Sequence, residues 1–274
     1  MIRDMTIGQY YPVKSVIHDL DPRVKIVCIL LFLISLFVQG NIIGYLVATL
    51  FLGSLIYASK VPLKYILKGL RPILLLLGMT VIFHLFLTRE GEILVQYGII
   101  RITAGGLRSA VFMGVRLVYL IIGSSLMTYT TTPNALTDGL EALLRPLNKL
   151  KVPVHEVAMM MSIALRFIPI LLEETDKIMK AQLARGADLD TGSIFQRVKA
   201  LVPILVPLFV SAFRRANDLA MAMESRCYHG GEGRTKMKPL QYQNKDYVVY
   251  GISWGYLVGM IIQEQVTSIN VWIF

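Results

Sequence analysis

The sequence has little cysteine and little charge, and each shortage excludes a class of protein. Its 274 residues include 2 cysteines, Cys28 and Cys227. Two cysteines are too few for a disulfide framework, and they cannot supply the three or four ligands of a zinc site. Charged residues make up 17% of the chain, whereas a typical soluble domain has about 25%. This composition argues against a disordered chain, a coiled coil and a water-soluble globule.

Long apolar runs are abundant instead, and they predict membrane-spanning helices. Hydrophobic residues make up 55% of the chain, and the mean hydropathy is +0.59. The 34 residues of 26–59 carry no charge, but as one helix they would be about 51 Å long, too long for a hydrocarbon core of about 30 Å. A turn signal at Gly40-Asn41 divides this run. We therefore expect five membrane-spanning helices, over about 24–40, 42–58, 72–88, 117–137 and 247–263.

Basic residues predict which side of the membrane each segment faces. The chain has 28 Lys and Arg against 18 Asp and Glu, a net charge of +10. Sixteen of the basic residues lie in 133–245, and the turn at 40–41 has none. Because cytoplasmic loops are enriched in Lys and Arg, we expect a cytoplasmic N-terminus and an extracellular C-terminus. The predicted domains are 1–132 with four spans, a cytoplasmic helical domain at 133–245, and 246–274 with the last span.

The predicted spans contain few charged groups. No Asp, Glu, Lys or Arg lies in the central part of the five runs, and we place Arg108 and Arg116 at the start of the fourth helix. His84 lies deep in a span, where a hydrogen bond to a neighbouring helix is the preferred interpretation over a proton relay. Ion-coupled transporters usually carry charges at membrane depth, so the pattern argues against that class. Close helix packing is predicted for the last span, where three glycines are spaced by four: Gly251, Gly255 and Gly259.

Segment 133–245 has the pattern of long helices with apolar stripes. Apolar residues at intervals of three and four, with prolines at helix starts, predict three helices over about 133–150, 153–186 and 193–228. Internal prolines remove a backbone hydrogen bond and bend a helix. We therefore expect bends, with the middle parts packed on each other and on the spans, at three positions: Pro169, Pro203 and Pro207.

A rival topology has seven spans. Residues 157–172 and 200–213 are apolar nearly all round, and both would cross the membrane in this alternative. Against it, Arg166 interrupts the first stretch, and the second has only 14 residues and contains two prolines. Long bent helices that lie along the inner membrane surface are the preferred interpretation. A short β-hairpin is also expected outside the membrane, around Tyr97-Gly98.

The second and third inside helices end in the same pattern, a small residue, an arginine and another small residue. These residues are Ala184, Arg185 and Gly186 in one and Ser225, Arg226 and Cys227 in the other, 41 residues apart. An arginine followed by glycine is ordinarily a helix cap. The second pattern has no glycine there, which we take as an argument against simple capping. Small neighbours leave the guanidinium prominent, able to bind a carboxylate in a groove, and two such ends predict two similar receptors.

The sequence contains no sign of its own energy source or catalytic site. It has no phosphate-binding G-x-x-x-x-G-K-[ST] loop, no zinc motif and no G-x-S-x-G elbow. The Gly-rich stretch 230–236 has the wrong spacing for phosphate binding and is interpreted as a linker. His155 and Glu156 are adjacent and so lie on different faces of a helix. We expect no catalytic residue, no metal and no cofactor bound by this chain, so that driven transport would need a partner with nucleotide chemistry.

With these patterns in place, the chain resembles the transmembrane T component of energy-coupling factor (ECF) transporters, the CbiQ/EcfT family. The likeness covers almost the whole chain. It rests on five sequence segments: Leu20-Asp-Pro-Arg-Val-Lys25, Thr131-Thr-Pro133, Ala164-Leu-Arg-Phe-Ile-Pro169, Ala181-Gln-Leu-Ala-Arg-Gly186 and Arg215-Ala-Asn-Asp-Leu-Ala-Met-Ala-Met-Glu-Ser-Arg226. The paired small-Arg-small patterns are specific to the family, and Cys227 departs mildly from its usual Gly, Ala or Ser.

The resemblance implies an all-α polytopic membrane protein, with five transmembrane helices and a cytoplasmic coupling domain of three long helices. It implies a non-catalytic subunit of an importer for vitamins or other micronutrients in the bacterial plasma membrane. Its partners would be two EcfA-like ABC ATPases, which bind ATP and Mg, and a membrane-embedded substrate-binding S component. Arg185 and Arg226, with their small neighbours, would contact the ATPases. The alternatives are a self-sufficient secondary transporter with seven spans and a membrane enzyme.

Overall fold

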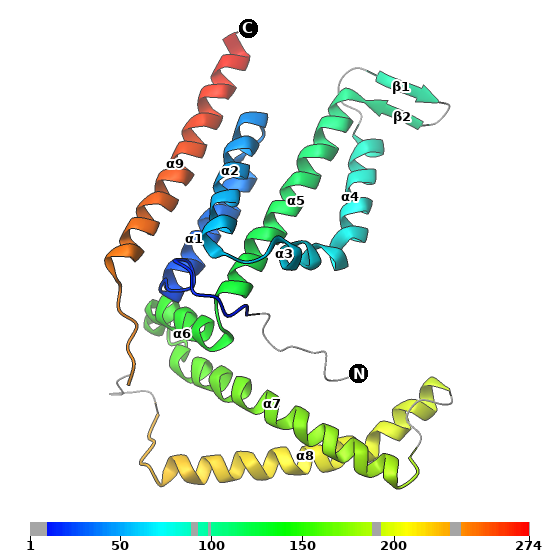
Figure 1. Ribbon diagram of the computed structural model, residues 1–274, viewed down its shortest axis with the longest axis vertical. Coiled ribbons are helices and arrows are strands. Elements are labelled where there is room, and N and C mark those ends of the chain that lie inside the picture. The colour runs from blue at the N-terminus through cyan, green and yellow to red at the C-terminus, as the bar shows by residue number, and fades with distance from the viewer. Residues whose placement is uncertain (1–9, 89–92, 98–99, 188–192, 231–236, 274) are drawn as a thin grey trace. The chain divides into compact units, whose positions relative to one another are not determined.

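The computed structural model describes residues 10–88, 93–97, 100–187, 193–230 and 237–273 (Figure 1). The described chain forms two compact units. The described residues of one lie within 10–139 and 240–273, and those of the other lie within 140–239. The boundary at Gly139 falls within a helix, so that α6 contributes residues to both units.

The larger unit consists mainly of helices that overlap the predicted spans without sharing their bounds. The fourth predicted span, 117–137, is interrupted at residues 131–132. Its elements are α1 (Pro22–Val38), α2 (Ile42–Ser59), α3 (Leu63–Leu70), the 3-10 turn η2 (Arg71–Ile73), α4 (Leu74–Leu87), β1 (Ile93–Tyr97), β2 (Ile100–Thr103), α5 (Ala104–Thr130) and α9 (Asn244–Ile273). The predicted hairpin of helices is confirmed, because α1 ends just before Gly40-Asn41 and α2 begins just after it. The predicted β-hairpin is also confirmed, with β1 antiparallel to β2.

The smaller unit consists of the helices predicted for segment 133–245. Its elements are the end of α6 (Pro133–Leu144), the 3-10 helix η3 (Arg145–Leu150), α7 (Val154–Ala184) and α8 (Ile194–Glu224). The first helix is shorter than predicted: α6 has 12 residues and gives way to η3, where Pro146 lacks the N–H that would continue an α-helix. Helices α7 and α8 have 31 residues each and pack on each other.

Four stretches in the described chain are long and apolar enough to cross a membrane. They are Ile42–Ser59, Leu63–Leu87, Ala104–Thr130 and Val154–Ala184. The first three overlap the predicted spans 42–58, 72–88 and 117–137, and the fourth is α7, which crosses the membrane in the rival topology. Helices α1 and α9, which cover the first and last predicted spans, are not among the four. The protein is therefore an all-helical membrane protein apart from its small hairpin.

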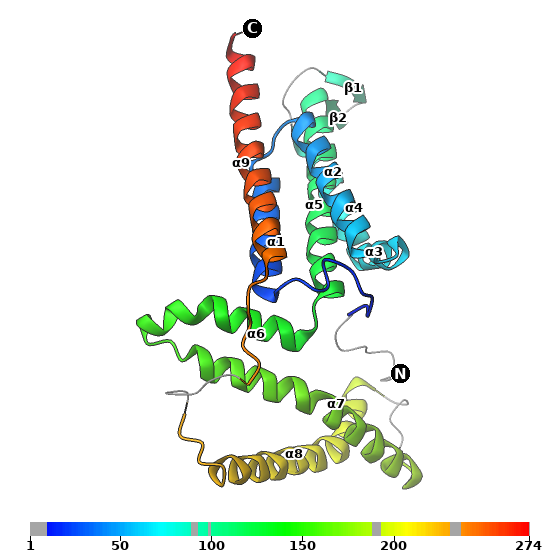
Figure 2. The same cartoon turned by 60° about the vertical axis from the view of Figure 1, so that its left-hand side comes forward.

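Helices α1 and α9 lie side by side and point the same way (Figure 1 and Figure 2). At their starts, the carboxylate of Asp246 is 1% exposed and accepts hydrogen bonds from the backbone N–H groups of Asp21, at 3.0 Å, and Gln243, at 2.7 Å. At the end of α1, the side-chain amide of Gln39 donates to the carbonyl of Met260, in the middle of α9, at 3.0 Å. The helices over the first and last predicted spans therefore run parallel.

Arg116 corrects the expectation that charge is absent from the middle of the spans. Helix α5 begins at Ala104, because the hydroxyl of Thr103 caps it by accepting from the N–H of Gly106 at 3.1 Å. Arg116 is therefore at the middle of a 27-residue helix rather than at its start. Its guanidinium donates to the hydroxyl of Tyr45 at 3.0 Å and to the carbonyl of Gln39 at 2.8 Å, so it satisfies the carboxyl end of α1.

The glycine spacing in α9 does not mark close packing within the described chain. A Cβ atom built on Gly251, Gly255 or Gly259 meets nothing within 4 Å. The close approach occurs instead at Gly123 of α5, where a Cβ atom would lie 2.9 Å from a ring carbon of Phe32. Phe32 belongs to the buried cluster that joins α1, α2 and α9. Close packing that requires a glycine therefore occurs at Gly123 of α5 and not at the three glycines of α9.

The segment before α1 is tied to the carboxyl end of α5. The N–H of Tyr11 donates to the carbonyl of Tyr129 at 2.9 Å. The ammonium of Lys25 donates to the carbonyls of His18 and Thr130, both at 2.9 Å. Burial lowers the pKa of His18, because the ring loses solvation that favours its charged form. These bonds fix the entry of the chain into α1.

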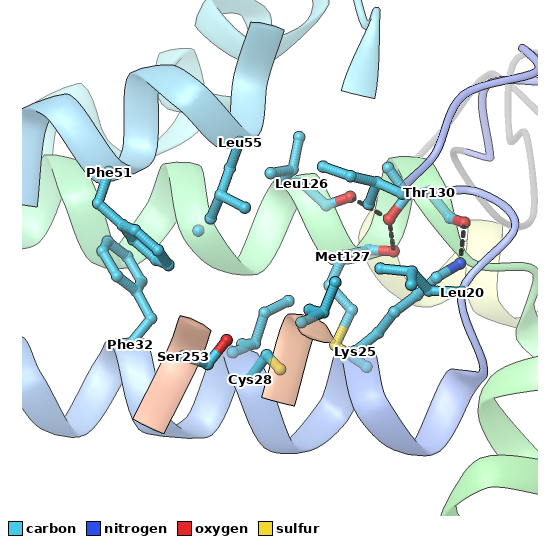
Figure 3. Close-up of a pocket in the computed structure, with 14 residues that line it drawn as sticks. Leu20, Lys25, Cys28, Phe32, Phe51, Leu55, Leu126, Met127, Thr130 and Ser253 are labelled. Atoms are coloured by element: carbon cyan, nitrogen blue, oxygen red, sulfur yellow. Dashed lines mark hydrogen bonds between the residues drawn. The ribbon is translucent and has the colours of Figure 1, made fainter. Parts of the chain in front are cut away.

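Figure 3 shows a small cavity of about 70 Å³ beside Lys25. Its wall is almost entirely apolar and includes Phe32, Leu126 and Gly123. The bond from Lys25 to Thr130 lies at one end, so the ammonium is turned to a carbonyl rather than to the cavity. The cavity is an internal packing space of the larger unit.

Substituting Gly123 by alanine is expected to loosen this packing. The added methyl group overlaps the ring of Phe32, and overpacking of this kind costs about 1–3 kcal/mol. Thermal unfolding of the purified protein in detergent should show a lower Tm. The control is Gly78→Ala, because a Cβ atom at Gly78 meets nothing within 4 Å. Equal Tm values for the two variants would contradict the packing described.

Candidate functional site

The candidate site consists of two tips, residues 184–186 at the end of α7 and residues 225–227 at the end of α8. In the first tip, Gly186 has a positive φ of 84°. Its N–H donates to the carbonyl of Leu183, and the N–H of Ala187 donates to the carbonyl of Gln182, both at 3.0 Å. This pair of bonds is a Schellman motif, which ends a helix by a left-handed residue. Arg185 is the last residue before that turn.

The second tip has the same backbone geometry. Cys227 has a positive φ of 56°, and its N–H donates to the carbonyl of Glu224 at 2.9 Å. The N–H of Tyr228 donates to the carbonyl of Met223 at 3.1 Å. The argument that the missing glycine speaks against a cap is therefore wrong. Cys227 adopts the left-handed conformation despite its side chain, and both arginines occupy the same position of one capping motif.

The left-handed cysteine leads to a testable prediction. A non-glycine residue in this region costs about 1 kcal/mol, so Cys227→Gly is expected to stabilise the cap by that amount. Hydrogen exchange of the amides of residues 227 and 228 should slow about fivefold. Cys227→Ser is the matched control, because it removes the sulfur and keeps the Cβ atom. A serine variant that slows exchange as much as glycine would contradict the conformational explanation.

Both tips are open to solvent. All six residues are exposed: Ala184, Arg185, Gly186, Ser225, Arg226 and Cys227. Within the described part of the chain, neither Arg185 nor Arg226 forms an ion pair. An exposed guanidinium with small neighbours can make two parallel hydrogen bonds to a carboxylate. The arrangement thus offers two equivalent sites for acidic partners.

The three prolines named from the sequence lie inside continuous helices. Pro169 is within α7, and Pro203 and Pro207 are within α8. All three are exposed rather than packed against a neighbour. Figure 1 shows α8 changing direction between its first turns and the remainder of the helix.

A side chain of α7 satisfies the backbone group that Pro207 frees. Proline has no N–H, so the carbonyl four residues earlier, on Pro203, has no helical donor. The side-chain amide of Gln182 donates to this carbonyl at 3.3 Å. Gln182 is three residues before Arg185, so the first tip is attached to the proline region of α8. No local sequence pattern predicts this contact.

Other residues of the smaller unit have roles that the sequence did not reveal. His155 pairs with Glu141, Nδ1 to Oε1, at 2.9 Å, which joins α7 to α6 rather than forming a catalytic pair with Glu156. Helix α8 also exposes a continuous set of large apolar side chains: Leu201, Val202, Leu205, Val206, Phe209, Val210 and Phe213. An exposed apolar face of this extent is typical of a surface that lipid or protein covers.

These features define a class, a helical membrane protein in which two packed helices end in exposed arginines. Residues 13–237 match the CbiQ family model, described as "Cobalt transport protein". The chain is 51% identical to the energy-coupling factor transporter transmembrane protein EcfT of Ruminiclostridium cellulolyticum, over 97% of this chain and 99% of that protein. It is 54% identical to EcfT of Clostridium kluyveri, over 90% and 92%, and 51% identical to EcfT of Bacillus subtilis, over 90% and 93%.

The chain belongs to the CbiQ family. The EcfT proteins are similar to this chain along nearly their whole length. Family membership agrees with the resemblance drawn from the five sequence segments. It establishes a membrane-embedded transporter subunit.

Proposed function

We propose that this chain is the coupling (T) subunit of an ECF-type importer for vitamins or other micronutrients. Two ABC-type ATPases dock on the tips, one on Arg185 and one on Arg226. The chain passes their ATP-driven motion to a membrane-embedded S component that binds the substrate. The observation that carries this proposal is the identical capping motif at both tips, which presents two arginines in one geometry to two similar receptors.

The proposal assigns the chemistry to the partners. ATP and Mg are bound by the ATPases, and this chain binds no cofactor and catalyses no reaction. The small neighbours Ala184, Gly186, Ser225 and Cys227 let each guanidinium enter its groove. Pro169, Pro203 and Pro207 give the long helices their course. The exposed apolar side chains of α8 support contact with the S component or with lipid.

The proposed topology has five spans, with the N-terminus cytoplasmic and the C-terminus outside, in a bacterial plasma membrane. Helices α1, α2, α4, α5 and α9 cross, and α6, α7 and α8 form the cytoplasmic coupling domain. The parallel course of α1 and α9 supports an odd number of crossings. Single cysteines at positions 185 and 226, in a Cys28→Ser/Cys227→Ser background, should both react with a membrane-impermeant thiol reagent from the inside. Labelling of either position from the outside would contradict five spans.

Reconstitution into liposomes tests the proposed function directly. Uptake should require this chain, both ATPases and the S component together, with ATP and Mg on the side of the ATPases. The secondary-transporter alternative predicts uptake by this chain alone under an ion gradient. Arg116 at the middle of α5 is the observation that favours the alternative, although its bonds to Tyr45 and Gln39 already give it a packing role. Gradient-driven uptake without ATPases would overturn the proposal.

A further inference from the structure

The two tip-bearing helices contact each other at equivalent positions. Arg185 and Arg226 are 41 residues apart, and the same offset relates Glu174 of α7 to Arg215 of α8. These two equivalent residues form an ion pair, Nη2 to Oε2, at 2.6 Å. The contact therefore lies eleven residues before the arginine of each tip. At 1.5 Å per residue, each tip is about 16 Å from the ion pair along its own helix.

The two helix segments between this contact and the tips, 174–185 and 215–226, which we call the arms, are alike in length and in lacking a proline. Residues 174–185 and 215–226 contain no proline, whereas Pro169, Pro203 and Pro207 all precede the ion pair in their helices. The helices run antiparallel, because Gln182, later in α7, contacts Pro203, earlier in α8. The two tips therefore extend from the ion pair in opposite directions. The geometry of the ion pair determines the distance between the tips.

The contact is more than a chance surface pair. Arg215 donates to the carboxylate of Glu174 at 2.6 Å, and Gln182 of α7 donates to the carbonyl of Pro203 at 3.3 Å, so that side chains join the two helices at two separate points. The side chains of Arg215 and Glu174 are 42% and 27% exposed. A partly exposed ion pair adds little to stability, but two contacts at different points along the helices, Glu174 with Arg215 and Gln182 with Pro203, fix the register of the two helices. Lys177 and Glu173 are the other charged groups beside Glu174 on its own helix.

We propose that Glu174 and Arg215 are positioning residues. Their ion pair holds α7 against α8 eleven residues before each tip arginine, and it thereby sets the distance between the two tips. The inference rests on the proposed function, in which that distance must match two ATPases. When this ion pair is formed, movement of one tip is passed to the other tip and to the membrane helices. Without it, the ATPases still bind, because Arg185 and Arg226 are untouched, but their motion is transmitted poorly.

The test measures tip distance and coupling in the assembled complex. Spin labels on Lys180→Cys and Met221→Cys, which are exposed and again 41 residues apart, report the distance between the arms in a Cys28→Ser/Cys227→Ser background. Glu174→Gln or Arg215→Gln should broaden the distance distribution. Uptake per ATP hydrolysed should fall about threefold or more, while ATPase co-purification stays at the level of the unaltered chain.

Two further variants separate positioning from general damage. The exchange Glu174→Arg/Arg215→Glu should restore both the narrow distribution and the coupling ratio. Glu173→Gln, an exposed neighbour on the same helix, should change neither. An unchanged distribution of spin-label distances in Glu174→Gln would overturn the positioning role of the ion pair. An exchange variant as defective as the single variants would also overturn it. Failure of the unaltered chain to hold ATPases at all would instead overturn the proposed function.

Discussion

Replacing Arg185 and Arg226 together by glutamate is expected to release the ATPases and abolish uptake. Each substitution puts a negative charge where the proposal has a carboxylate-lined groove. Losing one partner of a buried, hydrogen-bonded charge pair costs about 2–5 kcal/mol at an interface, and here both interfaces are lost. Co-purification of the ATPases with the tagged chain and ATP-driven uptake measure the effect. Membrane insertion should be unchanged, because both tips are exposed ends of helices.

The control variant has the same change in net charge, but at arginines that are not at the tips. Arg166→Glu/Arg214→Glu alters two other exposed arginines of α7 and α8. We expect this variant to keep its ATPases. The conservative pair Arg185→Lys/Arg226→Lys should bind more weakly than the unaltered chain, because lysine has the charge but not the two-pronged geometry. Full ATPase binding and uptake by the glutamate variant would refute docking at the tips.

Asp246→Ala is expected to destabilise the membrane part of the protein strongly. The substitution leaves the buried N–H group of Asp21 and the partly buried N–H group of Gln243 without their acceptor. A hydrogen bond to a charged group is worth about 1.5–3 kcal/mol, so the loss of two should total about 3 kcal/mol or more. A lower Tm in detergent, and more proteolysis between α8 and α9, would report the loss.

Two comparisons sharpen this prediction. Asp246→Asn keeps one acceptor oxygen and should fall between alanine and the unaltered chain. Asp218→Ala removes an exposed carboxylate of α8 and should leave the Tm unchanged. A Tm for Asp246→Ala equal to that of Asp218→Ala would show that the carboxylate does not hold the starts of α1 and α9 together.

The sequence predicted those parts of the fold that depend on local patterns. The turn at Gly40-Asn41, the β-hairpin around Tyr97 and the helices of the inside segment all follow from residues that are near neighbours in the chain. Helix boundaries were harder to predict from the sequence. The cap at Thr103 makes α5 begin at Ala104, which places Arg116 at the middle of the helix. Counting charge-free residues cannot locate such a cap.

The candidate site was predictable in its residues but not in its geometry. The paired small-Arg-small patterns identified both tips, yet the left-handed conformation of Cys227 contradicted the rule that a cap needs glycine. The ion pair of Glu174 and Arg215 joins residues 41 positions apart, which no local pattern specifies. Applying the spacing of the arginines to the rest of α7 and α8 would have suggested it. The glycines of α9 are the opposite case. Their spacing predicted close helix packing, but no other part of the described chain approaches them.

Photo-crosslinking from the tips reports directly whether the ATPases dock on Arg185 and Arg226. A photoreactive residue at position 184 or position 225, in the complex assembled with its ATPases and S component, should crosslink to an ATPase subunit at each position. The same residue at position 160, exposed on α7 and far from the tip along the helix, should give no ATPase adduct. Adducts of both tips with lipid or with the S component, and none with an ATPase, would contradict the account.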